Sequence, residues 1–170
     1  NNLVDITLDS RFATICGYTE RDVDTVFAPE LPGLDRDAIR EWYNGYGWLG
    51  EETVYNPFDV LLLFRTRRFA AHWFETGSPA FLVDMLTARG VSSVDLDDMI
   101  GSDELLSAFD AEHIATEALL FQGGYLTIAA EENAGDKTFY RLGYPNREVR
   151  QSLNGSLLRA LAPEQSMREG

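Results

Sequence analysis

The stretch Leu119-Leu120-Phe121-Gln122-Gly123-Gly124-Tyr125-Leu126-Thr127-Ile128 is the most informative part of this 170-residue chain. The apolar run before the two glycines is typical of the end of a helix, and the run after them is typical of a strand. A second strand is predicted at Thr138-Phe139-Tyr140-Arg141-Leu142, after a polar turn, and Tyr144-Pro145-Asn146 precedes a new helix. Helix, strand, turn, strand and helix therefore follow one another near the carboxyl end.

This order of elements predicts a winged-helix-like module with a small antiparallel hairpin, over residues 101–162. In DNA-binding modules of this kind, the helix before the first strand enters the major groove. Here that helix, predicted over residues 112–122, carries Glu112 and Glu117 and no lysine or arginine. The predicted turn over residues 131–136 is acidic as well. Because contacts to phosphate need Lys and Arg, we expect this module to dock on protein and not to bind DNA directly.

The composition is that of an acidic globular protein. The formal net charge is −14, and 45% of the residues are hydrophobic. This charge disfavours nucleic-acid phosphate and anionic membrane surfaces, since both attract Lys and Arg. The longest apolar stretch, residues 60–64, is too short to span a bilayer, and the amino end does not have the pattern of a secretory signal. We therefore expect a cytoplasmic protein that does not contact membranes.

Helix starts are well marked between residues 9 and 100. Four N-cap residues are predicted, at Thr19, Asp35, Asn56 and Ser78. The last two are each followed by proline, whose missing N–H costs nothing at the first helical position. Gly90 should end the fourth helix. Further helices are predicted over residues 103–109, 112–122 and 146–161, so the chain is predicted to be mostly α, within the α+β class.

The amino end has a different pattern. From Val4 to Leu8 apolar and polar side chains alternate, as they do in a half-buried strand. A single strand cannot pair its own backbone groups. Residues 1–8 are therefore predicted to be a strand whose sheet is supplied by residues upstream.

An aromatic, glycine-rich link follows the second helix, at Trp42-Tyr43-Asn44-Gly45-Tyr46-Gly47-Trp48. One hypothesis is a partner-binding surface. The alternative, which we favour, is a compact loop whose rings fill the core, because aromatic clusters are ordinary core material. The candidate partner-binding residues are Trp42, Tyr43, Tyr46, Trp48, Tyr55 and Phe58.

Short motifs follow one another in a fixed order along the chain. They are Cys16-Gly17-Tyr18-Thr19-Glu20, Trp42-Tyr43-Asn44-Gly45-Tyr46, Val54-Tyr55-Asn56-Pro57-Phe58, His72-Trp73-Phe74-Glu75-Thr76-Gly77-Ser78-Pro79, Phe81-Leu82-Val83, Gly124-Tyr125-Leu126-Thr127-Ile128 and Leu142-Gly143-Tyr144-Pro145-Asn146-Arg147-Glu148-Val149. Together they resemble the AAA-ATPase-like proteins, which often carry a PD-(D/E)xK-type nuclease domain at the far carboxyl end. The resemblance extends from Asn1 to about Leu161.

In proteins of that family, the phosphate-binding loop and the acidic strand that holds magnesium lie upstream of such a segment. This chain contains no Gly-x-x-x-x-Gly-Lys-Ser/Thr, and Gly135-Asp136-Lys137-Thr138 is predicted to be a hairpin turn. The resemblance therefore implies a non-catalytic segment that follows the core of a P-loop ATPase. ATP and magnesium are implied for the parent protein, and no cofactor for this chain. The implied partners are the upstream ATPase core, a possible downstream nuclease domain and other proteins.

The resemblance also implies a division of the chain. Residues 1–8 would be a strand left from the ATPase core, residues 9–100 a helical lid-like region, residues 101–162 the winged-helix-like module and residues 163–170 a tail or linker. In an AAA-type ATPase, a lid arginine can reach the nucleotide phosphates as a bidentate fork. The candidates for such phosphate sensing are Arg11, Arg65, Arg67 and Arg68, with surface ion pairing as the alternative.

Other chemistry has little support in the sequence. His72 and His113 each lack a second ligand at metal-binding spacing, and the acidic residues 95–104 lack the pattern of a calcium loop. The serines have no nucleophile motif. Catalytic and metal-ligating residues are therefore not predicted. Three hypotheses follow: a regulatory segment of an ATPase that couples nucleotide state to a downstream effector, a free-standing protein- or peptide-binding adaptor that uses the surface from Trp42 to Trp48, and a nucleic-acid reader, which the charge disfavours.

Overall fold

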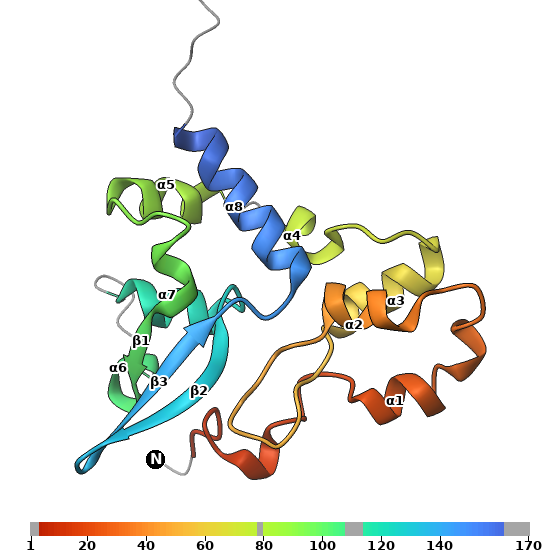
Figure 1. Cartoon of the computed structure of the whole chain (residues 1–170), viewed down its shortest axis with the longest axis horizontal. Coiled ribbons are helices and arrows are strands. Elements are labelled where there is room, and N and C mark those ends of the chain that lie inside the picture. The colour runs from red at the N-terminus through yellow and green to blue at the C-terminus, as the bar shows by residue number, and fades with distance from the viewer. Residues whose placement is uncertain (1–3, 78–79, 108–113, 162–170) are drawn as a thin grey trace, which may run out of the picture.

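The computed structural model describes residues 4–77, 80–107 and 114–161 (Figure 1). As predicted, it belongs to the α+β class, with helices as its main regular structure and one small antiparallel sheet. The helices are α1 (Glu20–Thr25), α2 (Arg36–Tyr43), α3 (Pro57–Thr66), α4 (His72–Thr76), α5 (Ala80–Ala88), α6 (Asp103–Ser107), α7 (Thr116–Gln122) and α8 (Arg147–Leu161). The strands are β1 (Ile100–Ser102), β2 (Thr127–Ala134) and β3 (Lys137–Gly143). Short 3-10 helices occupy Ser10–Phe12, Ala28–Glu30 and Asp95–Asp98.

Three of the predicted N-caps are confirmed. Thr19 forms a capping box with Asp22 at the start of α1, with Asp22 N donating to Thr19 Oγ1 at 3.1 Å. Asp35 accepts from two amides of α2, and Asn56 Oδ1 accepts from Phe58 N at 3.0 Å at the start of α3. These bonds satisfy amides that have no partner within a helix. The fourth predicted cap, Ser78, lies outside the described residues. Gly90 follows α5 with a φ of +69°, as a helix-ending glycine does.

The amino-terminal half packs around its own hydrophobic cluster. α1, α2 and α3 lie together at one end of the molecule (Figure 1). Their buried side chains are Val23, Ile39, Tyr43, Tyr55, Val60, Leu63 and Phe64. Because apolar positions of α2 and α3 recur at helical spacing, each helix turns one face toward this cluster.

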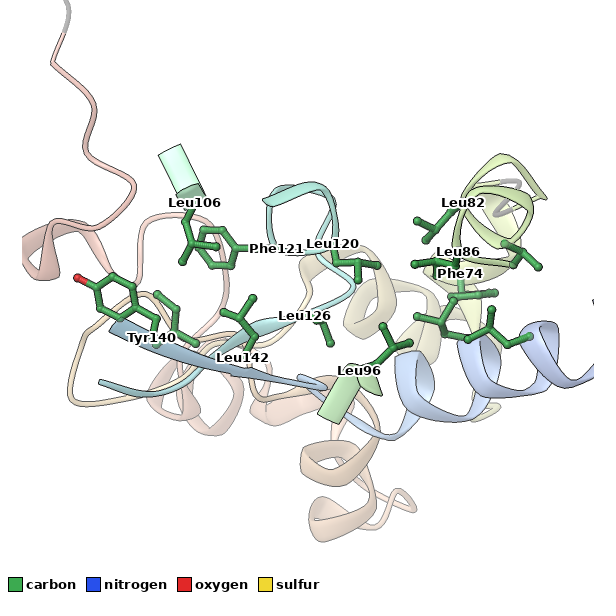
Figure 2. Close-up of a cluster of buried hydrophobic side chains, with 14 residues drawn as sticks. Phe74, Leu82, Leu86, Leu96, Leu106, Leu120, Phe121, Leu126, Tyr140 and Leu142 are labelled. Carbon is green, nitrogen blue, oxygen red and sulfur yellow. The ribbon is translucent and has the colours of Figure 1, made fainter. Parts of the chain in front are cut away.

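The carboxyl-terminal half forms a second cluster over the sheet. The strand order is β1-β3-β2, and all pairs are antiparallel. Figure 2 shows Leu82 and Leu86 of α5 gathered near α8, and Leu106 and Phe121 gathered over the sheet beside Leu142. Since α4 and α5 contribute to this cluster, the core that includes the sheet begins upstream of the predicted boundary at residue 101.

The predicted hairpin forms, with a shorter turn than expected. The turn was expected over residues 131–136, but β2 continues to Ala134 and the turn consists of Gly135 and Asp136. Cross-strand contacts account for the difference, because Thr138 Oγ1 donates to Asn133 Oδ1 at 3.0 Å. Gly135 has a φ of +68°, which a tight turn of this kind requires.

Two further expectations need correction. Val4 to Leu8 do not form a strand: the Asp5 carboxylate accepts from Thr7 N at 2.9 Å and the chain turns. No neighbouring strand pairs with these residues within the described part of the chain, and an unpaired strand leaves its backbone groups unsatisfied. Residues 112 and 113 of the helix predicted over residues 112–122 lie outside the described residues. Among the described ones, the helix begins at Thr116, because Ala115 has an extended backbone with ψ of 148°.

Strand β1 was not predicted. It has three residues, and Gly101 at its centre carries no side chain to show an apolar alternation. A Cβ at Gly101 would lie 2.7 Å from the Leu106 side chain, so the close packing of α6 on β1 needs glycine there. In α8, Val149, Leu153 and Leu157 recur every four residues and are buried, whereas Leu161 at the end of the helix is exposed.

Candidate functional site

The aromatic residues predicted to bind partners do not form one exposed surface. Tyr43, Tyr46 and Tyr55 are buried, while Trp42 and Trp48 are partly buried. The Tyr43 hydroxyl donates to the Ala70 carbonyl at 2.9 Å, which is a structural use of its polar atom. The link therefore matches the favoured alternative, a compact loop whose rings fill the interior. Phe58 is the one clearly exposed member of the six, at 42%.

This loop also joins the two halves of the molecule. Gly47 N donates to Thr127 Oγ1 at 2.8 Å, and that hydroxyl donates back to the Gly47 carbonyl at 3.1 Å. The guanidinium of Arg147, at the start of α8, lies 4.9 Å from the ring centroid of Trp42 on α2. Trp42 thus holds α8 and does not offer a free face.

Glu20, in the first of the resembling motifs, binds several side chains of the amino-terminal half. Its carboxylate accepts from Arg40 Nε at 2.8 Å, from the Tyr55 hydroxyl at 2.9 Å and from Asn44 Nδ2 at 2.9 Å, and it pairs with Arg36. Burial alone would raise the pKa of Glu20, but the hydrogen bonds from Arg40 and Tyr55 outweigh it and lower the pKa. These contacts give Glu20 a structural role.

The four candidate phosphate-sensing arginines have different environments. Arg11 pairs with Asp9, and Arg67 donates to the backbone carbonyls of Glu30 and Pro32, where it closes the end of α3. The side chains of Arg65 and Arg68 are exposed and have no hydrogen-bond or ion-pair partner among the described residues. Only these two are free to meet an anion.

One face of α3 combines free positive charge with exposed apolar surface. Phe58, Leu61 and Arg65 recur at positions i, i+3 and i+7, so they lie on the same side of the helix. Phe58 is 42% and Leu61 47% exposed, whereas Val60, Leu63 and Phe64 on the other side of the helix are buried. We call Phe58, Leu61 and Arg65 the α3 face. Its chemistry suits a protein surface that is apolar and acidic.

A pair of buried carboxyl groups lies behind the α3 face. Asp59 of α3 and Glu148 of α8 are both fully buried. Trp73 N donates to Asp59 Oδ1 at 2.8 Å, and Phe74 N donates to Glu148 Oε1 at 3.0 Å. The two side chains, which we call the carboxyl pair, therefore satisfy successive amides of α4 and bring α3, α4 and α8 together.

The carboxyl pair has unusual electrostatics. Burial raises the pKa of Glu148 well above its usual 4.5, and the neighbouring Asp59 carboxyl raises it further. Burial also raises the pKa of Asp59, against the opposing effects of the neighbouring Glu148 carboxyl group and of the hydrogen bond from the Trp73 amide. The other oxygen of each carboxyl group, Asp59 Oδ2 and Glu148 Oε2, has no hydrogen-bond partner among the described residues. The hydroxyl of Tyr46 and the amide nitrogen of Asn146 are also buried without a hydrogen-bond partner among the described residues.

The sequence did not reveal the carboxyl pair. Asp59 follows one of the resembling motifs and Glu148 lies in another, but each has the spacing of an ordinary helical residue. An acidic residue directly between apolar neighbours, as in Phe58-Asp59-Val60, was the available signal. It could not identify a partner so far away in the sequence.

A cavity of about 380 Å³ lies near the junction of the two halves. Its walls include the side chains of Tyr46, Trp48, Tyr55 and Trp73 and the backbone of Gly124. This volume is in the range of small-molecule sites. None of its lining residues is charged, so a nucleotide would find no cation for its phosphates there.

Residues 4–77, 80–107 and 114–161 contain neither a cluster of metal-ligating side chains nor a membrane-spanning helix. That part of the chain contains no group of three or more His, Cys, Asp and Glu side chains that could hold a metal ion. None of its helices combines the length and apolar character needed to cross a bilayer. His72 Nε2 lies 3.0 Å from the Arg68 carbonyl, whereas His113 lies outside the described residues.

Comparison with known proteins finds a longer protein to which this chain is similar. No protein-family profile matches the chain. No solved structure matches it either. The chain is similar to an uncharacterized protein in the vnfD 5′ region of Azotobacter chroococcum mcd 1, with 60% identity over 164 residues. The match covers 96% of this chain and 32% of that protein, so the chain spans about a third of the length of its relative.

Proposed function

We propose that this chain is a non-catalytic, lid-like and winged-helix-like segment of an AAA-type P-loop ATPase. Its role would be to couple the nucleotide state of the ATPase core to a downstream effector domain. ATP and magnesium would bind the parent protein outside this segment. A cytoplasmic location is part of the proposal, in keeping with a chain that has a single cysteine and so no internal disulfide.

The order of elements from α5 to β3 carries this proposal. A helix, a short strand, two helices and a hairpin follow one another, and the short strand pairs with the second hairpin strand. This is the arrangement expected of a winged-helix-like module. α8 continues from the hairpin and packs back on α5 (Figure 1). The motifs that resemble AAA-ATPase-like proteins contribute the rest of the argument.

The relative supports the idea of a segment. About two thirds of that protein lies outside the match, which leaves room for an ATPase core and for an effector such as a nuclease domain. The relative is itself uncharacterized, so both domains are part of the proposal.

The α3 face supplies a docking surface for the ATPase core. Arg65 and the neighbouring Arg68 are free cations in a chain with a net charge of −14. Phe58 and Leu61 beside them provide apolar surface. We propose that an acidic, apolar surface of the core covers this face in one nucleotide state and exposes it in another.

The runner-up is a free-standing adaptor. Its predicted surface, from Trp42 to Trp48, is largely inside the molecule. Such an adaptor would have to use the α3 face instead. The two functions differ in whether the occupant of that face belongs to the same polypeptide.

Hydroxyl-radical footprinting of the full-length protein tests the proposal. It should be done with a non-hydrolysable ATP analogue and with ADP. The labelling rates of Phe58 and Leu61 should differ between the two states, while that of Phe81, which is 74% exposed on α5, serves as the comparison. Equal rates at Phe58 and Leu61 in both states would contradict coupling through this face.

A second test addresses the absence of catalysis. This chain alone should neither bind ATP tightly nor hydrolyse it, because no phosphate-binding loop occurs in its sequence. Titration calorimetry with ATP and magnesium measures this directly. Micromolar binding would show that the chain has a nucleotide site of its own and would overturn the assignment as a non-catalytic segment.

A further inference from the structure

We infer that Asp59 and Glu148 share a single proton and form a pH-responsive connection between α3, α4 and α8. This inference concerns the fold of the chain itself and stands whether or not the parent protein is an ATPase. It starts from the geometry of the carboxyl pair. Each carboxyl group is fully buried, binds one amide of α4 with one oxygen, and has a second oxygen without a partner.

A single shared proton would give both unpartnered carboxyl oxygens a hydrogen bond. With no proton, two negative charges would face one another in the interior, which costs both desolvation and repulsion. With one proton, the hydroxyl of Glu148 donates to Asp59, so that both unpartnered oxygens, Oε2 and Oδ2, gain a hydrogen bond. Two close carboxyl groups commonly hold one proton for this reason.

The surroundings provide donors but no paired cation. The hydroxyl of Tyr46 and the amide of Asn146 are buried donors without a partner, and the pKa of Tyr46 is raised by burial and then by Glu148 and Asp59. Burial and then the charges of Asp59 and Glu148 raise the pKa of Tyr43 on α2. Its hydroxyl donates to a backbone carbonyl and not to the carboxyl pair. His72 on α4 is the one positively ionisable group that acts on Asp59, and its ring contacts the Arg68 carbonyl.

Arg147, which directly precedes Glu148 on α8, interacts with other residues. Arg147 pairs with Glu41 at 3.5 Å and lies over the Trp42 ring. Among the described residues, no lysine or arginine therefore forms a hydrogen bond or ion pair with the carboxyl pair. The second negative charge that appears when the proton leaves is not compensated.

Loss of the proton would act on the junction between the two halves. Asp59 belongs to the helix that builds the amino-terminal cluster, while α8 carries Leu153 and Leu157 of the carboxyl-terminal cluster. Repulsion within the carboxyl pair would separate α8 from α3 and release the amides of α4. The connection is thus firm below the pH of proton loss and loosens above it.

The pH dependence of unfolding tests this inference on the full chain. In the unfolded state both carboxyl groups ionise near their usual pKa, whereas the folded pair keeps one proton. The unfolding equilibrium constant of the wild type should therefore rise by up to about tenfold per pH unit from about pH 5 upward. Glu148→Gln keeps a neutral donor in place and should remove this rise.

Matched variants distinguish the shared proton from other titrations. Glu131→Gln changes an exposed carboxylate on β2 and should follow the wild-type profile. Identical slopes for the wild type and Glu148→Gln would overturn the inference.

Infrared spectroscopy provides a measurement that does not depend on the stability of a variant. The folded wild type at neutral pH should show the C=O band of a buried carboxylic acid, and unfolding should abolish it. If Glu148→Gln fails to fold, Asp59→Asn is the variant to use. It leaves one carboxyl group of the pair and should shift or remove the band. A wild-type spectrum with carboxylate bands only would contradict the shared proton.

Discussion

Gly45 is a residue at which the two halves of the chain approach closely. Its φ is +123°, and a Cβ built there would lie 1.7 Å from the carbonyl oxygen of Pro145. Glycine is therefore required by both the backbone conformation and the lack of space. Like Gly47, it belongs to the aromatic link whose polar and apolar groups fill the junction.

We expect Gly45→Ala to lower the free energy of unfolding by more than about 3 kcal/mol. Gly77→Ala is the matched control, because no atom lies within 4 Å of a Cβ at Gly77. That change should be neutral or should raise the free energy of unfolding by about 0.5 kcal/mol. Urea denaturation followed by circular dichroism measures both. Equal midpoints for the two variants would show that the chain avoids the contact with Pro145.

Glu20 provides a second prediction at this scale. Because its folded pKa is lowered, its stabilising effect is present above the usual value of 4.5 and is lost as the pH falls through the folded pKa. Glu20→Gln should cost about 1 kcal/mol at neutral pH, a modest figure because the carboxylate is about a third exposed. The variant should also lose less stability than the wild type on acidification. Glu52→Gln, at an exposed carboxylate, is the control for a change of net charge.

At the scale of elements, helix starts depend on short-range bonds. Asn56 shows this for α3: its side chain accepts from Phe58 N, and Pro57 occupies the first helical position. α3 in turn carries both the α3 face and Asp59. A loosened start would thus affect the exposed face and the carboxyl pair together.

Asn56→Ala should therefore destabilise the fold by about 1 kcal/mol, and Asn56→Ser, which retains a capping oxygen, by less. Chemical denaturation of both variants measures the difference. If the midpoint of Asn56→Ala equals that of the wild type, the cap does not contribute to the stability of α3.

At the scale of the whole molecule, charge decides which partners are available. The described part of the predicted recognition helix, α7, contains Glu117 and no basic residue, and Glu131, Glu132 and Asp136 lie on the hairpin. Arg141 pairs with Glu132 and Asp98, so it is not free for phosphate. The α3 face lies on a different element and carries Arg65, whose side chain has no partner among the described residues.

The chain should consequently fail to bind duplex DNA with submicromolar affinity at physiological salt. Fluorescence anisotropy at low and at physiological salt measures this. A double variant, Glu131→Lys with Asp136→Lys, should gain weak, strongly salt-dependent binding if the hairpin charge is the reason. Saturation by the wild type at submicromolar concentration in physiological salt would overturn the preference for protein docking.

The sequence alone determined the features that depend on neighbours within a few residues. The caps at Thr19, Asp35 and Asn56 each bind amides two or three positions away, so a local pattern was enough to find them. The hairpin followed from two β-forming runs around a glycine turn. These interactions predicted the α+β class and most helix starts.

Only the tertiary structure decided the features that join distant segments. Asp59 and Glu148 meet because α3 and α8 both pack on α4, and neither residue marks the other in the sequence. The sequence favoured burial of the aromatic loop but did not decide which of its rings are buried, because an aromatic loop has the same composition inside and outside a protein. Strand pairing could not be predicted either, since backbone pairing requires a neighbour that local sequence does not specify. β1 pairs with β3, whereas Val4 to Leu8 pair with no strand among the described residues.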